Sequence, residues 1–338
     1  MRILYGSIVL SLIFMSACSS NPVLPVPDNP LAEDFVTIWE AFDETYPEFP
    51  VKSVDWHLAY DTYYPIAQAA ETSDEVMMNA VLPMLAELQD GHVWMLPPGG
   101  SQIYTYTPEY SLNYDMSVLQ NNYLFVNGWS GWSHGVGYCD PDSLPYLAIK
   151  TWPSNLDPAV VDSFIALCAE TPAIIIDVRM NSGGSNMMTK AVVGRFTHEE
   201  CTGWMWRYRT GPGYDDCEYE PVMNLVLGPQ QYNGDIILLM GDYCASTTEE
   251  FILRMKELPN VTLVGDTTMG CACCPEWIKF SSGWAVTHGI WSMRTTQQEP
   301  VEGSGIAPDI YVEATEEEFA QGIDPVLEYA IGMLGDRE

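Results

Sequence analysis

Basic residues are scarce in this chain. Only 13 lysine and arginine residues accompany 46 aspartate and glutamate residues among 338, and the formal net charge is −33. Such a charge repels polyanions, so nucleic acid is not expected as a partner. Hydrophobic residues still make up 47% of the chain, which is enough to bury a sizeable core and argues against wholesale disorder. The length allows one large domain or two ordinary ones.

The chain also lacks a membrane-spanning run at its start. The apolar segment Ile3–Ala17 follows a positively charged start but is short for a transmembrane helix. It ends in small residues before Cys18 and resembles a bacterial lipoprotein signal. We therefore expect a signal peptide over residues 1–17 and lipidation of Cys18, which would hold the protein on a membrane through a lipid anchor. An ordinary cleaved signal is the alternative.

Either kind of signal exports the protein, so a periplasmic or cell-surface location is expected. Ser19 does not resemble the aspartate that retains lipoproteins at the inner membrane. This favours the outer membrane of a Gram-negative host. Residues 18–30, which are rich in proline, are expected to form a tether.

Cysteine, in contrast, is abundant for a reduced cytosolic protein, with nine residues. Setting Cys18 aside leaves eight, an even number that favours disulfide bonds without fixing their pairing. The cluster Cys271-Ala272-Cys273-Cys274 offers metal ligands. No second cysteine pair stands at finger spacing and no histidine is near in sequence, so we expect no metal site and no cofactor.

Hydrophobic patterning divides the rest of the chain into three parts. Residues 31–92 have apolar side chains at helical spacing and predict an N-terminal helical bundle, in which Pro83 should kink or split the third helix. Residues 93–150 have short β-prone stretches, including 102–106 and 123–127, and predict a small β-rich region. Residues 151–338 predict an α/β core with right-handed parallel crossovers. Its expected strands are 173–178, 236–240 and 261–264, and its expected helices are 160–169, 187–196, 247–258 and 324–334.

Three loops carry polar residues that the fold alone does not require. They are Asp90-Gly91-His92, the glycine turn that runs from Asp177 to Gly184, and the turn Cys244–Glu249. Each has a structural alternative: a helix cap, a tight turn and a capping box, respectively. Each also has a functional interpretation, because glycine turns and helix N-termini hold developing negative charge.

Taken together and in order, these motifs resemble the serine peptidase family of carboxy-terminal processing (tail-specific) proteases, tricorn core proteases and retinoid-binding protein modules. The resemblance covers about residues 31–334 and rests on blocks at 85–92, 174–184, 245–249, 264–270 and 302–309. It implies an α/β fold with a crotonase/ClpP-like core, that is, a mixed β-sheet with βαβ crossovers. The glycine-loop signature of the family's PDZ module is not evident in residues 93–150.

The family divides by its general base. In the processing branch a lysine follows the serine by about 25 residues, but here Thr268-Met269-Gly270 is followed by Cys271. The tricorn-like branch uses the histidine of the D-G-H block and a glutamate of the last block, which are present as His92 and Glu302. This chain therefore resembles the tricorn-like branch.

The resemblance implies roles for five residues. Ser246 would be the nucleophile and His92 its base, with Glu302 orienting His92 directly or through another polar side chain. The amides of Gly184 (or Gly183) and Thr247 would form the oxyanion hole.

We therefore expect an exported lipoprotein serine endopeptidase that acts on peptide or protein substrates. The alternative is a catalytically silent relative that binds peptide or hydrophobic ligands. A crotonase-type enzyme would share the core fold, but export and the acidic charge argue against a CoA partner.

Overall fold

The computed structural model describes residues 28–225 and 228–335. The expected signal peptide, Cys18 and most of the expected tether lie outside these residues. No helix within the two ranges has the length and apolar character needed to cross a membrane.

The N-terminal part is helical, as predicted. It contains α1 (Glu33–Thr45), α2 (Phe49–Lys52), α3 (Trp56–Ala69), α4 (Ser73–Val76) and α5 (Leu82–Ala86). Asn29 caps the first turn by accepting a hydrogen bond from the Leu31 amide. The predicted third helix is split by a π-helical turn, Met77–Val81, which lies between α4 and α5. Pro83 follows this turn and has no N–H to donate to it.

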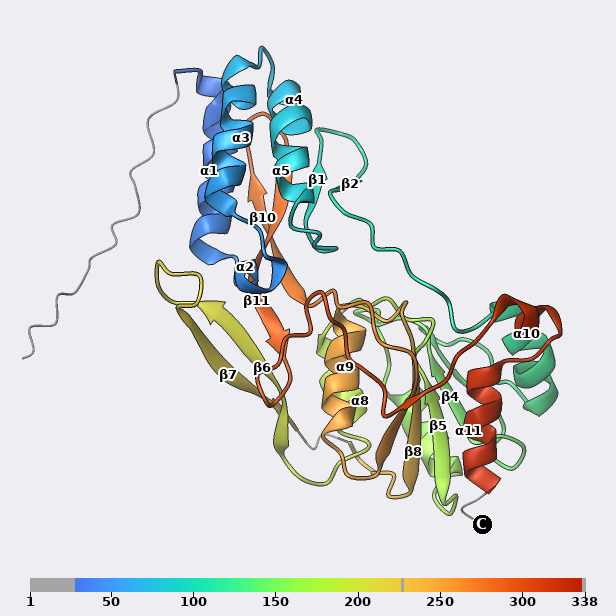
Figure 1. The fold of residues 1–338 in the computed structure, drawn as a ribbon. Helices are drawn as coiled ribbons and strands as arrows, with labels where there is room; N and C mark the ends of the chain where they lie inside the picture. Colours follow the sequence, from blue (N-terminus) through green and yellow to red (C-terminus); the bar gives the residue numbers. More distant parts are fainter. Residues whose placement is uncertain (1–27, 226–227, 336–338) are drawn as a thin grey trace, which may run out of the picture.

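These helices cover an antiparallel six-stranded sheet with the order β2-β1-β11-β6-β7, in which β10 also pairs with β11. Its strands are β1 (Trp94–Leu96), β2 (Ile103–Tyr104), β6 (Cys201–Arg209), β7 (Cys217–Asn224), β10 (Cys273–Lys279) and β11 (Ala285–Arg294). Aromatic side chains of α1 and α3 share one hydrophobic cluster with Val286 of β11. The first and last thirds of the chain therefore pack together in this part of the molecule (Figure 1).

The second sheet is the predicted α/β core. Its order is β12-β9-β8-β5-β4-β3, and every pair is parallel except β3 with β4. The strands are β3 (Val136–Tyr138), β4 (Tyr146–Ile149), β5 (Ala173–Asp177), β8 (Asp235–Met240), β9 (Val261–Gly265) and β12 (Ile310–Tyr311). The helices around it are α7 (Ala159–Leu167), α8 (Met187–Val193), α9 (Thr247–Lys256), α10 (Glu316–Ala320) and α11 (Pro325–Gly335).

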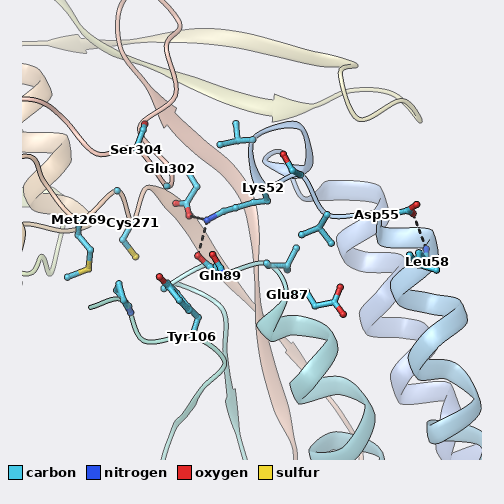
Figure 2. Close-up of a pocket in the computed structure, with 18 residues that line it drawn as sticks. Lys52, Asp55, Leu58, Glu87, Gln89, Tyr106, Met269, Cys271, Glu302 and Ser304 are labelled. Atoms are coloured by element: carbon cyan, nitrogen blue, oxygen red, sulfur yellow. Dashed lines mark hydrogen bonds and ion pairs between the residues drawn. The ribbon is translucent and has the colours of Figure 1, made fainter. Parts of the chain in front are cut away.

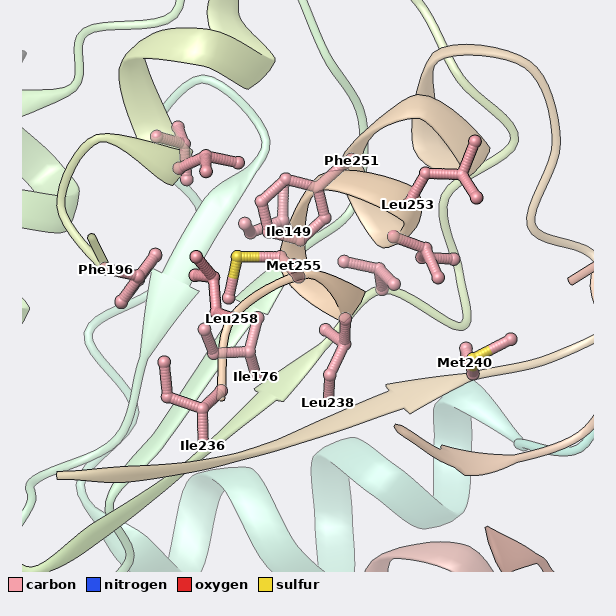
Figure 3. Packing of buried hydrophobic residues seen from close by; sticks show 14 of the residues in the cluster. Ile149, Ile176, Phe196, Ile236, Leu238, Met240, Phe251, Leu253, Met255 and Leu258 are labelled. Carbon is pink, nitrogen blue, oxygen red and sulfur yellow. The ribbon is translucent and has the colours of Figure 1, made fainter. Parts of the chain in front are cut away.

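Alternating side chains of the central strands cover both faces of this sheet. Ile176 and Leu238 pack with Phe251 of α9 on one face, as Figure 3 shows. Ile175 and Ile237 pack on the opposite face with the buried side chains of α11. Burial on both faces is characteristic of parallel sheets and explains the continuous apolar strands.

The prediction of a strand at residues 123–127 is wrong. This segment belongs to a helical stretch formed by α6 (Met116–Val118), a π-helical run and a 3₁₀ turn that ends at Asn127. Asp115 starts it by accepting hydrogen bonds from two amides. Leu119, Tyr123 and Leu124 then lie on one helical face and are buried in the same cluster as α11.

Residues 93–150 do not form one β-rich unit in the structure. β1 and β2 join the antiparallel sheet, whereas β4 pairs with β5 of the core sheet. The expected boundary at residue 151 therefore separates two strands that are hydrogen-bonded to each other.

The expected disulfide bonds are not formed, because all eight described cysteines are free thiols. Cys139, Cys168 and Cys244 are buried singly in hydrophobic clusters, where cysteine packs as a small apolar side chain.

Candidate functional site

Ser246 lies at the turn between β8 and α9, directly before the first residue of the helix. Its backbone angles are φ 57° and ψ −124°. Positive φ is unfavourable for a residue with a Cβ and costs on the order of 1–3 kcal/mol. The turn places the half-buried Ser246 side chain at the positive, N-terminal end of α9. This end of a helix stabilises negative charge, which develops beside a nucleophile during acyl transfer.

Glu249 fixes this turn. One carboxylate oxygen accepts hydrogen bonds from the amides of Ser246 (3.0 Å) and Cys271 (2.9 Å). The other accepts from the Thr268 hydroxyl (2.6 Å) and the Gly270 amide (2.8 Å). Burial raises the pKa of Glu249 to about 7, and the four donors oppose this shift. Glu249 thus joins the nucleophile turn to the loop that follows β9.

The glycine turn after β5 lies against Ser246. A Cβ at Gly183 would stand 3.0 Å from the Cβ of Ser246, so a side chain there would crowd the nucleophile. Gly183 and Gly184 have φ values of 114° and 142°, a region that favours glycine. The Gly183 amide already donates to the Asn181 side chain (3.0 Å). Of the two glycines that the sequence left open, Gly184 is therefore the better candidate for an oxyanion donor.

His92 follows α5 and precedes β1, and its side chain is 8% exposed. Burial lowers its pKa below the ordinary value, while Asp90 and the backbone of Cys273 act in the opposite direction. The ring is therefore neutral at pH 7, the form that accepts a proton. Its Nδ1 is buried and has no hydrogen-bond partner among the described residues.

His92 and Ser246 both line the same two pockets, of about 320 and 300 Å³. The first is formed mainly by Ser185, Asn186, Thr247, Glu250, Ala272, Cys273, Cys274, Pro275, Trp291 and Met293. The second is rich in aromatic side chains, with Trp94, Tyr104, Tyr106, Tyr110 and Tyr243. The predicted nucleophile and base thus stand where two pockets meet.

The sequence left open whether Glu302 contacts His92 directly or through another polar side chain. One carboxylate oxygen forms an ion pair of 2.6 Å with Lys52 of α2, and the other accepts from the amides of Ala272 and Cys273. Lys52 also donates to the Gln89 carbonyl, as Figure 2 shows. Within the described residues, no hydrogen bond joins Glu302 to His92. Lys52 was not predicted from the sequence, because it lies outside every motif.

Asp90 is the carboxylate whose charge opposes the lowering of the His92 pKa by burial. It is fully buried and accepts hydrogen bonds from the Tyr46 hydroxyl (2.9 Å) and the His92 amide (2.8 Å). The Lys52 ammonium pairs with Glu302, and the charge of Asp90 acts on it from a longer distance. Burial and the charge of Asp90 raise the pKa of Glu302, and the ion pair with Lys52 opposes this rise. Burial alone would lower the pKa of Lys52, but the two carboxylates raise it.

Part of the glycine-turn motif is structural. Arg179 is fully buried and forms ion pairs with Asp177 (2.7 Å) and Asp324 (2.8 Å). Its guanidinium also donates to the Asn113 carbonyl. These contacts join the end of β5 to the start of α11, so the acid and the arginine in this motif hold the turn rather than a substrate.

The chain is similar to known peptidases. The family model described as "Peptidase family S41" matches residues 143–312, half of the chain. No curated protein sequence matches. Among solved structures, a putative peptidase from Parabacteroides merdae is 27% identical with a TM-score of 0.80, covering 91% of this chain and 97% of its own.

Two more distant structures share the fold. Mature CPAF is 12% identical with a TM-score of 0.66, covering 90% of this chain and 96% of its own. Tricorn protease is 14% identical with a TM-score of 0.56, covering 90% of this chain and 36% of its own. The chain belongs to peptidase family S41 and is a serine-type peptidase.

Proposed function

We propose that the protein is an exported lipoprotein endopeptidase in which Ser246 is the nucleophile and His92 the general base. Its substrates are peptide or protein chains. The observation that carries the proposal is the position of both side chains at the junction of two pockets. An endopeptidase must hold its substrate on both sides of the cleaved bond, and two pockets beside Ser246 offer room for the two sides.

The chemistry follows acyl transfer. As the Ser246 hydroxyl attacks the carbonyl carbon of the peptide bond, His92 takes its proton. The amides of Gly184 and Thr247 stabilise the oxyanion. His92 then protonates the leaving amine, and a water molecule that loses its proton to His92 releases the acyl group from Ser246.

Glu302 acts in this proposal through Asp90. Its charge keeps Lys52 paired, which leaves the Asp90 carboxylate free of a direct ion pair and able to stabilise the imidazolium. Its contacts with the amides of Ala272 and Cys273 also hold the strand that faces His92. Glu302→Gln should lower kcat by up to roughly 10⁴-fold with little change in KM, as when the carboxylate of a Ser–His–Asp triad is lost. An unchanged kcat in the folded variant would remove Glu302 from the mechanism.

Peptides with both ends blocked test the endopeptidase proposal. The full chain should cleave such peptides internally, with products read by mass spectrometry, and Ser246→Ala should abolish cleavage. Ser163→Ala, an exposed serine on α7, serves as the matched control. Cleavage only at free ends would exclude an endopeptidase, and no cleavage of any peptide would favour the silent, ligand-binding relative.

The lipoprotein part of the proposal rests on Cys18 and the apolar segment before it. Cys18→Ser should release the protein from the membrane fraction and prevent incorporation of labelled fatty acid. Membrane retention of this variant would contradict the anchor. Outer-membrane location is tested by separating the two membranes.

A further inference from the structure

We propose that His92, Cys271 and Asp90 form a binding site for zinc or a similar soft divalent cation, and that the bound ion switches the peptidase off. The binding site stands on its own geometry. The inhibition rests on the proposed role of His92 as the base.

The three side chains converge although two come from one loop and the third from another. One ligand atom of each, a ring nitrogen, a thiol sulfur and a carboxylate oxygen, lies within 4.8 Å of the other two. Gly91 makes this possible, because a Cβ there would stand 2.8 Å from the Cys271 sulfur. The glycine of the D-G-H block thus leaves room for the thiol.

An independent observation points to a ligand at this place. Nδ1 of His92 is buried without a hydrogen-bond partner among the described residues, in a side chain that is only 8% exposed. Leaving a buried polar atom unpaired is costly, so such atoms are uncommon. Asp90 is fully buried and forms no ion pair within the described part of the chain, and its oxygens accept one hydrogen bond each, from the Tyr46 hydroxyl and the His92 amide. A cation bound through Nδ1 would satisfy this ring nitrogen and balance the charge of Asp90 through a lone pair that these bonds leave free.

The donor set fits zinc. Thiolate, imidazole and carboxylate are its usual protein ligands, and three of them leave a fourth position for water. The expectation of no metal site considered only residues near the cysteine cluster in sequence, whereas His92 and Asp90 reach Cys271 through the fold. The pocket of about 300 Å³ that contains His92, Cys271 and Ser246 offers an entry path.

A second group of side chains that could hold a metal ion consists of Asp90, Cys273 and Glu302. Their ligand atoms also lie within 4.8 Å of one another. The charge of Glu302 is already paired with Lys52 and its other oxygen accepts from two amides, whereas Asp90 forms no ion pair among the described residues. The ion is therefore assigned to the group that contains His92.

Coordination of His92 removes the base. A neutral imidazole has one nitrogen with a free lone pair and one that carries a proton. When the metal takes the lone pair, the other nitrogen holds the proton and cannot accept one from Ser246. This holds whichever ring nitrogen binds the ion.

Calorimetric titration of the full chain with Zn²⁺ tests the site, together with Co²⁺ absorption, which reports thiolate ligation through a charge-transfer band. Cys271→Ser should lose the band and weaken Zn²⁺ binding by at least the roughly 10–100-fold seen when a ligand's hydrogen-bonding partner is removed. Cys217→Ser is the matched control, because Cys217 is a partly exposed free thiol on β7 that lies outside the cluster and outside both pockets at Ser246. It should bind both ions as the wild type does.

Peptide hydrolysis supplies the second readout. Zn²⁺ should inhibit the wild type and Cys217→Ser, and a chelator should restore their activity. The rate of Cys271→Ser, measured against its own zinc-free rate, should not fall when Zn²⁺ is added. Wild-type Zn²⁺ affinity in Cys271→Ser, or no thiolate band with Co²⁺, would overturn the site. Zinc-free protein that binds the ion as predicted but hydrolyses nothing would support the site and contradict the proposed function instead.

Discussion

Ser246 is held in a backbone conformation that favours glycine, with φ 57°. The surrounding contacts impose this conformation, since Glu249 binds the Ser246 amide and Gly183 packs against its Cβ. Strain of this kind is found at functional sites, where it fixes a side chain before the substrate arrives. The serine is therefore positioned in the free protein.

Replacing this serine separates strain from chemistry. Ser246→Gly and Ser246→Ala both remove the nucleophile, but only glycine relieves the positive φ. We expect the glycine variant to be more stable than the alanine variant by about 1 kcal/mol, after its larger unfolded-state entropy is counted. Denaturant unfolding of both variants measures this difference, and an equal or lower stability of Ser246→Gly would show that the turn is not strained.

The pH dependence of activity reports on His92. Its pKa is lowered by burial, and a base works only when deprotonated. Activity should therefore rise with pH at a midpoint below the ordinary histidine value of about 6.5. His92→Ala should remove most turnover, whereas Lys279→Ala, the first lysine after Cys271 in sequence, should change little. A midpoint near pH 8–9, lost in Lys279→Ala, would point to a lysine base.

Sequence motifs predicted the residues of the candidate site but not the partners that these residues have in the structure. Ser246 and His92 belong to short blocks whose residue types reflect their chemistry, and the structure brings them together. Lys52 carries no such mark, because its importance comes only from the fold placing it 2.6 Å from Glu302. The closeness of Asp90 and Cys271 could not be predicted for the same reason, because only the fold brings the two side chains together.

Among secondary-structure elements, α9 and the loop after β9 depend on one side chain. Glu249 accepts four hydrogen bonds that join these two segments. Glu249→Gln would place an amide NH₂ against N–H donors, which leaves buried donors unpaired. We expect a loss of about 1–3 kcal/mol in the free energy of unfolding and reduced kcat, because the nucleophile turn would loosen.

Denaturant unfolding and steady-state kinetics measure both effects. Glu317→Gln, an exposed glutamate in the first turn of α10, is the matched control and should change neither. Wild-type stability of Glu249→Gln would mean that the hydrogen bonds of Glu249 do not hold the turn.

Elements whose conformation depends on tertiary contacts were harder to predict from the sequence. Buried parallel strands such as β5 and β8 were predicted because both faces require continuous apolar residues. The long strands β6, β7, β10 and β11 were missed, because their burial varies along one strand and gives no simple alternation. The segment 123–127 was wrongly predicted as a strand, since its apolar residues fit either period and packing against α11 decides for the helix.

Across the whole molecule, buried ion pairs connect α2 and its flanking residue to distant parts of the chain. Glu48, directly before α2, is fully buried and pairs with Arg294 of β11 at 2.7 Å. Lys52, at the end of the same helix, pairs with Glu302 beside the site. The N-terminal helices are therefore tied electrostatically to the segments that complete the site.

A double-mutant cycle tests this connection. Glu302→Gln leaves the buried ammonium of Lys52 without its partner and should lower the free energy of unfolding by about 3–5 kcal/mol. Adding Lys52→Met removes the unpaired charge and should recover most of that loss. Denaturant unfolding of the two single variants and the double variant measures the coupling, and strictly additive losses would show that the pair is not a unit.

The central claim is that Ser246 is a nucleophile activated by His92. Labelling of the full chain with a fluorophosphonate probe, followed by peptide mass spectrometry, tests it most directly because no substrate need be known. The account predicts one label on Ser246, none in Ser246→Ala, and strongly slowed labelling in His92→Ala. A wild-type protein that is folded but remains unlabelled, or a label on another serine, would contradict it.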